Sequence, residues 1–177
     1  MGLQGRINLA DGQRLSLRNS AYISAGELVL PTDFLNGQGQ HRYSQAYTGH
    51  VLDMRGSSTQ IELGTIPTAA GEVFWHLLYD FGNTLTMFVS WGGLVGRVTR
   101  DGVNSAPVNA GAYNPAAHPH LRMEESGGTV TFRASGDGVT WTTIGSLAHG
   151  FTSTQLSSLR HEFNAGGQAQ PFTVARI

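Results

Sequence analysis

Residues 72–91 alternate between large apolar and more polar positions with a period of two, which is typical of β-strands that bury one face. The run 72–81 reads EVFWHLLYDF, the run 84–91 reads TLTMFVSW, and the Gly82-Asn83 pair between them is typical of a hairpin turn. The pattern therefore predicts two paired antiparallel strands. The face expected to line a sandwich interior comprises Val73, Trp75, Leu77, Tyr79, Phe81, Leu85, Met87, Val89 and Trp91.

The opposite face of this hairpin mixes aromatic and hydrogen-bonding side chains, so it is not a plain solvent face. Aromatic rings beside hydrogen-bonding groups are what a sugar-binding surface requires. The same mixture would suit a surface that packs against a neighbouring subunit or a covering loop. Both interpretations stay open, and both rest on the candidate ligand-binding positions Phe74, His76, Asp80, Thr86, Phe88 and Ser90.

Most other apolar segments are also short and end at turns rich in glycine, such as Ser126-Gly127-Gly128, or at an Asp-Gly pair such as Asp101-Gly102. A short helical turn is expected within 152–159, and no repeat of fixed period or internal linker divides the chain. The pattern predicts an all-β fold, an antiparallel β-sandwich of the jelly-roll type, in one domain over residues 19–177 after an N-terminal arm over residues 1–18. Further strands are expected within 21–30, 43–54, 59–66, 94–100, 120–125, 129–134, 139–144 and 171–177.

Composition narrows the classes of partner. Charged residues are 13% of the 177 positions, against roughly 25% in ordinary soluble domains, while the chain contains 24 glycines. The net charge is -1 and the eleven arginines are scattered, which argues against nucleic acid as a partner. The absence of cysteine excludes disulfides and thiolate metal sites. No signal-like run and no stretch of ~18 apolar residues is present, so we expect synthesis in the cytoplasm and no membrane partner.

The segment SGDGVTW, residues 135–141, concentrates an acid, hydroxyls, glycines and a tryptophan. A calcium loop needs more carboxylates, and a phosphate-binding loop needs a lysine and a following helix. We interpret the segment as a turn in which Asp137 and Gly138 reverse the chain and Ser135 caps a free N–H group. Val139 and Trp141 are then expected to point inward.

The spacing of the polar residues does not indicate a catalytic site. Retaining glycosidases need two carboxyl groups about 5 Å apart, yet no two acidic residues are two or four positions apart, and the adjacent Glu124 and Glu125 would face opposite sides of a strand. No G-x-S-x-G motif is present, and His118 and His120 lack a nearby third metal ligand. A pair of carboxylates brought together from separate strands stays open as an alternative. We expect no catalytic residues, no metal, no cofactor and no enzymatic activity.

Several motifs resemble one family. Residues 113–141, YNPAAHPHLRMEESGGTVTFRASGDGVTW, resemble a recurrent stretch of concanavalin A-like sandwich domains of the LamG and lectin type, as do AGELVLP and LDMRGSSTQIEL upstream. Such domains are common in minor tail and other virion proteins of bacteriophages that infect actinobacteria. His120 stands where the family often has tryptophan, which places any role of that aromatic in doubt.

The resemblance implies a structural protein of the virion, a minor tail protein that assembles with other virion proteins and forms a homo-oligomer such as a trimer. A second hypothesis gives it a receptor-reading role on host cell-wall glycan. The alternatives are a capsid decoration protein and a free-standing carbohydrate-binding module.

Overall fold

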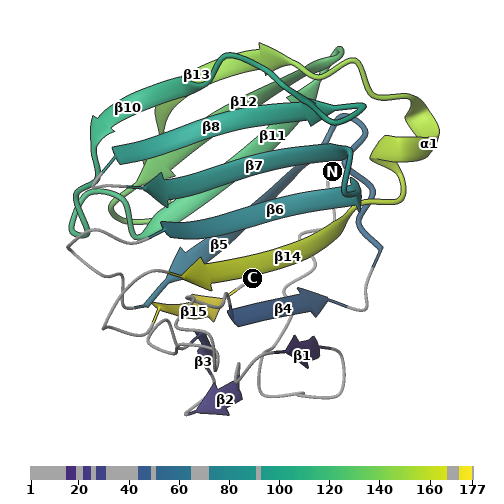
Figure 1. Ribbon diagram of the computed structural model, residues 1–177. Helices are drawn as coiled ribbons and strands as arrows, with labels where there is room; N and C mark the ends of the chain where they lie inside the picture. The colour runs from purple at the N-terminus through teal and green to yellow at the C-terminus, as the bar shows by residue number, and fades with distance from the viewer. Residues whose placement is uncertain are drawn as a thin grey trace.

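The computed structural model describes residues 15–18, 22–24, 27–30, 44–48, 51–64, 72–90, 93–166 and 172–176. These residues form an all-β sandwich of two antiparallel sheets, as predicted (Figure 1). Sheet A contains, in spatial order, β1 (Leu15–Arg18), β4 (Ser44–Thr48), β14 (Arg160–Gly166), β6 (Glu72–Asp80), β7 (Asn83–Ser90), β8 (Gly93–Arg100) and β10 (Val108–Ala112), with β9 (Val103–Asn104) also paired to β8. Sheet B contains β13 (Thr142–Ala148), β12 (Thr129–Ser135), β11 (His120–Ser126), β5 (Ser58–Leu63), β15 (Phe172–Arg176), β3 (Glu27–Leu30) and β2 (Tyr22–Ser24).

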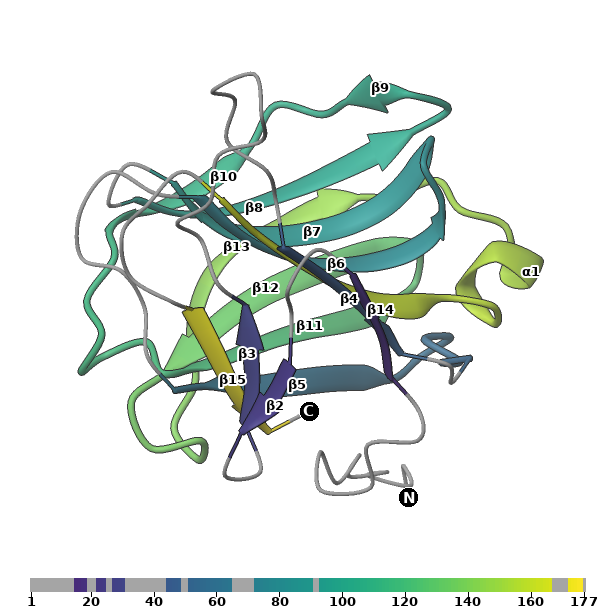
Figure 2. The same cartoon turned by 60° about the horizontal axis from the view of Figure 1, so that its bottom comes forward.

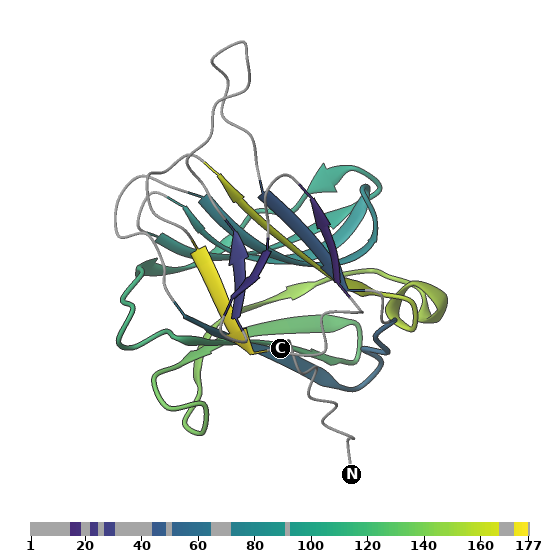
Figure 3. The same ribbon diagram turned by 90° about the horizontal axis from the view of Figure 1, so that it is seen from below.

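The two sheets form separate layers with the hydrophobic core between them. Figure 2 shows β6, β7, β8 and β14 in one layer and β5, β11 and β12 in the other, and Figure 3 shows β15 beside β3. The only helix in the described residues, α1 (Ser153–Leu156), is too short to cross a membrane. The largest fully buried side chains include Trp75, Phe132, Phe163, Met54, Leu77 and Met87.

The inward face of the β6–β7 hairpin is confirmed for most of its length. Val73, Trp75, Leu77, Leu85, Met87 and Val89 are all buried in the core. Tyr79 and Phe81 were wrongly placed on that face, since their exposures are 41% and 84%. The register between β6 and β7 shifts between Leu78 and Asp80, and Phe81 lies in the turn after β6, so the alternation ends before both residues. Trp91 lies outside the described residues.

The two sheets approach each other closely at Gly96 of β8. A Cβ atom on Gly96 would lie 2.6 Å from the ring of Phe132 on β12. The Phe132 ring therefore occupies the space that any other residue at position 96 would need for its side chain. Glycine at this position allows sheet A to pack directly on the aromatic ring.

A histidine in the core links the sheets by hydrogen bonds. On β14, His161 Nδ1 accepts a hydrogen bond of 2.9 Å from Trp75 Nε1. The other ring nitrogen, His161 Nε2, lies 3.3 Å from Thr59 Oγ1 of β5. Its ring stacks against those of Trp75 and Phe163. Complete burial lowers the pKa of His161 from 6.5 to about 4, so the ring is neutral at pH 7.

Four strands of sheet A were not expected from the sequence, namely β1, β9, β10 and β14. Residues 160–166 form β14, which lies between β4 and β6, although no strand was predicted there. Residues 15–18, within the segment interpreted as an arm, form β1 and pair with β4. The predicted turns at Ser126-Gly127-Gly128 and Asp101-Gly102 are confirmed, and positive φ angles occur at Asp101, Gly102, Gly127 and Gly128.

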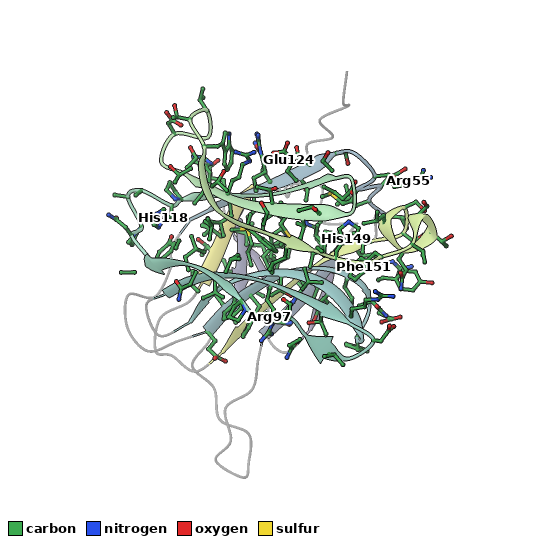
Figure 4. All side chains as sticks on the ribbon, turned by 90° about the horizontal axis from the view of Figure 1, so that it is seen from above. Arg55, Arg97, His118, Glu124, His149 and Phe151 are labelled. Atoms are coloured by element: carbon green, nitrogen blue, oxygen red, sulfur yellow. The ribbon has the colours of Figure 1, made fainter. Side chains whose placement is uncertain are left out.

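A buried hydrogen bond between Glu125 and His149 joins three loops at the α1 end of the sandwich, where Figure 4 places His149 and Phe151. Glu125 accepts hydrogen bonds from the N–H groups of Gly56 and Gly128, and His149 Nε2 lies 3.3 Å from Glu125 Oε1. Because His149 Nδ1 accepts a bond from Phe151 N–H, the ring proton lies on Nε2 and is donated to the carboxylate. Burial raises the pKa of Glu125, but these hydrogen bonds outweigh it and lower the pKa overall.

Helix α1 begins with a capping box. Thr152 Oγ1 accepts a bond from Gln155 N–H, and the Gln155 side chain accepts one from Thr152 N–H. Thr152→Ala is expected to lower the free energy of unfolding by about 1 kcal/mol, because one end of this reciprocal pair is lost. Urea unfolding will measure the change. Thr154→Ala, the same substitution within the helix, is the control, and equal losses in the two variants would contradict the role of the cap.

The SGDGVTW segment is a loop between β12 and β13, as interpreted. Asp137 Oδ1 accepts bonds from the N–H groups of Val139 and Thr140, and Ser135 Oγ accepts bonds from those of Asp137 and Gly138. The bonds from the N–H groups of Thr140 and Val139 lower the pKa of Asp137 far below its usual value. The inward placement of Val139 and Trp141 was wrong, because β13 starts only at Thr142. Val139 is 80% exposed, and Trp141 lies under the guanidinium of Arg122, 4.0 Å from its ring centroid.

Candidate functional site

The strand register aligns two rows of side chains on the face of sheet A that points away from sheet B. Each row crosses β8, β7, β6 and β14. The side chains alternate along the strands with those of the core, which fixes them on this outer face. We call the eight residues the cross-strand site: one row comprises Arg97, Thr86, His76 and Glu162, and the other comprises Val95, Phe88, Phe74 and Asn164.

The centre of the cross-strand site is aromatic. The ring of Phe74 stacks against Phe88 with centroids 5.2 Å apart, and against His76 with centroids 5.5 Å apart. The guanidinium of Arg97 lies over the Phe88 ring, 5.2 Å from its centroid. The four side chains are half-buried, so each still presents part of its surface. Packing among them holds a rigid platform of rings on the outer face.

Hydroxyl groups connect to this platform through His76. Its Nδ1 atom lies 2.9 Å from Thr86 Oγ1, which lies 3.2 Å from Thr84 Oγ1. Burial, and then the positive charge of Arg97, lower the pKa of His76 from 6.5 to about 4. His76 is therefore a neutral hydrogen-bonding group at pH 7, and Arg97 supplies the positive charge of the platform.

Four of the six predicted site residues thus meet in the structure, namely Phe74, His76, Thr86 and Phe88. Asp80 is not among them, because it lies at the end of β6, where its Oδ1 accepts bonds from Gly82 N–H and Asn83 Nδ2. That carboxylate shapes the β6–β7 turn. Ser90 pairs with Glu72 and Gly93 at the far end of β7, and its side chain lies outside the described residues.

Sequence reasoning missed the contribution of β14. Glu162 is only 4% exposed, and Asn164 Nδ2 donates a hydrogen bond of 2.8 Å to its Oε1. Asn164 Oδ1 is buried without a hydrogen-bond partner among the described residues. The alternation in RHEFNAG, with His161 and Phe163 inward and Glu162 and Asn164 outward, was the available signal.

The other histidines considered as metal ligands have different surroundings. His118 Nδ1 accepts a bond from Asn114 N–H, and its ring lies at a tilt to Tyr113. The ring of His120 lies beside Gly138 in the β12–β13 loop. In the described part of the chain, no three His, Cys, Asp or Glu side chains gather as a metal site.

Solved structures with the same fold include both lectins and glycoside hydrolases. A legume lectin-like domain from Entamoeba histolytica superposes with a TM-score of 0.65 at 10% identity, covering 93% of this chain and 88% of that one. A β-glucanase from Bacillus licheniformis gives 0.64 at 6% identity, covering 98% and 95%. Lectin I-B4 from Griffonia simplicifolia gives 0.56 at 10% identity, covering 98% and 97%. No family model and no curated protein sequence matches the chain.

These likenesses establish the concanavalin A-like sandwich and correct one expectation. The sequence led us to expect no enzymatic activity, and that conclusion was wrong, because glucanases and other glycoside hydrolases share this fold. The expectation rested on the absence of two carboxylates at strand spacing, and it overlooked Glu162, a buried carboxylate of the cross-strand site. Whether the protein is an enzyme is therefore open.

Proposed function

We propose that this protein is a bacteriophage virion component, a minor tail protein, which binds glycan of the host cell surface through the cross-strand site. The observation that carries the binding role is the platform of Phe74, Phe88 and His76 with Arg97 over it. Sugar rings present C–H faces that pack on aromatic rings and hydroxyl groups that bond to polar neighbours. The lectin-like fold neighbours are consistent with this role.

The assignment to a virion rests on the motif resemblance of residues 113–141 and the two upstream segments. In this role the sandwich assembles with other virion proteins, as a homo-oligomer, and presents its glycan site to the cell. Labelling of purified particles with gold-conjugated antibody tests the location. A few copies on the tail support the proposal, whereas many copies on the head indicate a capsid decoration protein, and unlabelled particles contradict the virion assignment.

Binding is tested by sedimenting the labelled protein with purified actinobacterial cell envelopes. Phe74→Ala and Phe88→Ala are each expected to weaken binding by more than about tenfold, because truncating an aromatic anchor of an interface costs about 2 kcal/mol or more. Phe81→Ala, in the turn of the same hairpin and 84% exposed, is the matched control and should bind as the parent does. Circular dichroism verifies the fold of each variant. Phe74→Leu keeps apolar bulk without the ring, so it separates the contribution of the aromatic ring from that of side-chain volume.

The supernatant of the same experiment is assayed for soluble sugar. Saturable binding that the two phenylalanine variants lose supports a glycan site on sheet A. Release of reducing sugar over time adds hydrolysis to binding, and its loss in Glu162→Gln would assign that activity to the same face. No binding at high protein concentration contradicts the proposal and indicates that this face packs against another virion subunit.

A further inference from the structure

Arg97 is the cation of the platform. Its guanidinium lies over Phe88 and is half-buried, and its Nε atom is buried without a hydrogen-bond partner in the described part of the chain. Among the described residues no carboxylate lies within ion-pairing distance of it. By comparison, Arg133 on the outer face of sheet B is paired to Glu124 at 3.0 Å, and Figure 4 shows Arg97 and Glu124 on opposite sides of the sandwich.

An unpaired guanidinium that is partly removed from water is costly. Arginine stays charged at all relevant pH values, so it cannot lower this cost by losing a proton. The ring of Phe88 compensates part of the lost hydration through its π electrons. An anionic group on a ligand would compensate the rest, since a guanidinium binds carboxylate and phosphate oxygens through two parallel hydrogen bonds.

The cross-strand site also has opposite charges at its two ends. Arg97 lies on β8 and Glu162 on β14, with the neutral Thr86 and His76 between them in the same row. Three strand spacings of about 4.8 Å separate the two ends by about 14 Å. The guanidinium of Arg97 favours an anionic substituent over β8, whereas the carboxylate oxygens of Glu162 favour hydroxyl donors toward β14.

We propose that the glycan bound at the cross-strand site is acidic and that Arg97 binds its carboxylate or phosphate group, with the adjoining sugar ring on Phe74 and Phe88. This inference rests on the proposed glycan-binding function. It adds a charge requirement, which aromatic stacking alone would not impose.

The test compares three soluble polymers in calorimetric titrations of the full chain. Oligogalacturonate supplies carboxylates, its carboxyl-reduced form supplies the same rings without charge, and a glycerol phosphate polymer bearing sugar substituents supplies phosphate. We expect one of the two acidic polymers to bind at least about tenfold more tightly than the reduced polymer. The preference should weaken as the salt concentration rises.

Two variants locate the charge requirement. Arg97→Gln is expected to remove the preference for the acidic polymer, whereas Arg100→Gln, which removes the same charge from an exposed position on the same strand, should keep it. Arg97→Lys keeps the charge without the planar fork and should show an intermediate preference. A second readout is the NMR titration of His76. A bound anion offsets the charge of Arg97. The pKa of His76 should therefore rise with the acidic polymer and not with the reduced one.

The possible outcomes distinguish a failure of the acidic assignment from a failure of the proposed glycan binding. Equal affinity for acidic and reduced polymers, unchanged in Arg97→Gln and lost in Phe74→Ala, overturns the acidic assignment and leaves glycan binding intact. Acidic preference that Arg97→Gln retains also overturns it, because the charge is then recognised elsewhere. If neither these polymers nor cell envelopes bind, glycan binding itself is contradicted. Where Arg97→Gln does not fold, the His76 titration of the parent chain decides. A His76 pKa that rises with the acidic polymer alone supports the acidic assignment, and an unchanged His76 pKa overturns it.

Discussion

Phe132→Ala should lower the free energy of unfolding by about 3–5 kcal/mol, because the ring is fully buried between the two sheets. The loss has two causes: the apolar surface of the ring is no longer buried, and the cavity above Gly96 cannot close while the sheets hold their positions. Gly96→Ala alone should cost about 1–3 kcal/mol by the opposite mechanism, since its Cβ would lie 2.6 Å from the ring.

The double variant makes the prediction specific to this contact. Phe132→Ala removes the obstacle to a methyl group at position 96, and the methyl group fills part of the cavity. The double variant should therefore be more stable than the sum of the two single losses implies, by more than about 1 kcal/mol. Urea unfolding of the four proteins measures this coupling. Simple additivity would show that the ring and the glycine do not interact as the structure indicates.

Acid should destabilise the fold through His161. Its pKa is about 4 in the folded state against 6.5 for a free imidazole. Between these values the unfolded chain takes up a proton that the folded chain does not, so this contribution to stability is complete above pH 6.5 and falls as the pH falls toward 4. The difference corresponds to roughly 3 kcal/mol. His76, whose pKa is also lowered to about 4, acts in the same direction.

His161→Phe separates the contribution of the core histidine. At pH 7 the variant should be less stable by about 1–3 kcal/mol, because Trp75 Nε1 loses its buried acceptor. From pH 7 to 4.5 the parent loses the His161 contribution and the variant does not, so the gap should narrow by roughly 2–3 kcal/mol. Urea unfolding at both pH values measures it. A constant gap would show that His161 titrates normally in the fold.

Alternation was a sound guide where a strand stayed regular. The inward residues from Val73 to Leu77 and from Leu85 to Val89 were predicted because a strand with one buried face must repeat every two residues. The prediction failed at Tyr79 and Phe81, where a register shift and a turn interrupt that period. Such a shift depends on the hydrogen bonds of Asp80 and Asn83, which local hydrophobicity does not encode.

The cross-strand site was only half visible from the sequence. Four residues of one hairpin were found because their strands are adjacent in the chain. Arg97 and the pair Glu162 and Asn164 come from β8 and β14, and their meeting with the hairpin depends on strand order, which a single sequence does not specify. β14 escaped notice because its inward residues are a histidine, a phenylalanine and an alanine, and the histidine was not expected in the core.

Both long edge strands on one side of the sandwich are irregular. The pairing of β10 with β8 shifts between Asn109 and Ala112, and that of β13 with β12 shifts so that Ile144 has no opposite residue. A bulged edge offers a poor template for another strand. β13 carries no charged side chain, so a regular edge at this strand would invite strand-to-strand polymerisation. The two bulges therefore favour side-chain surfaces over added strands for any association of this protein with a partner.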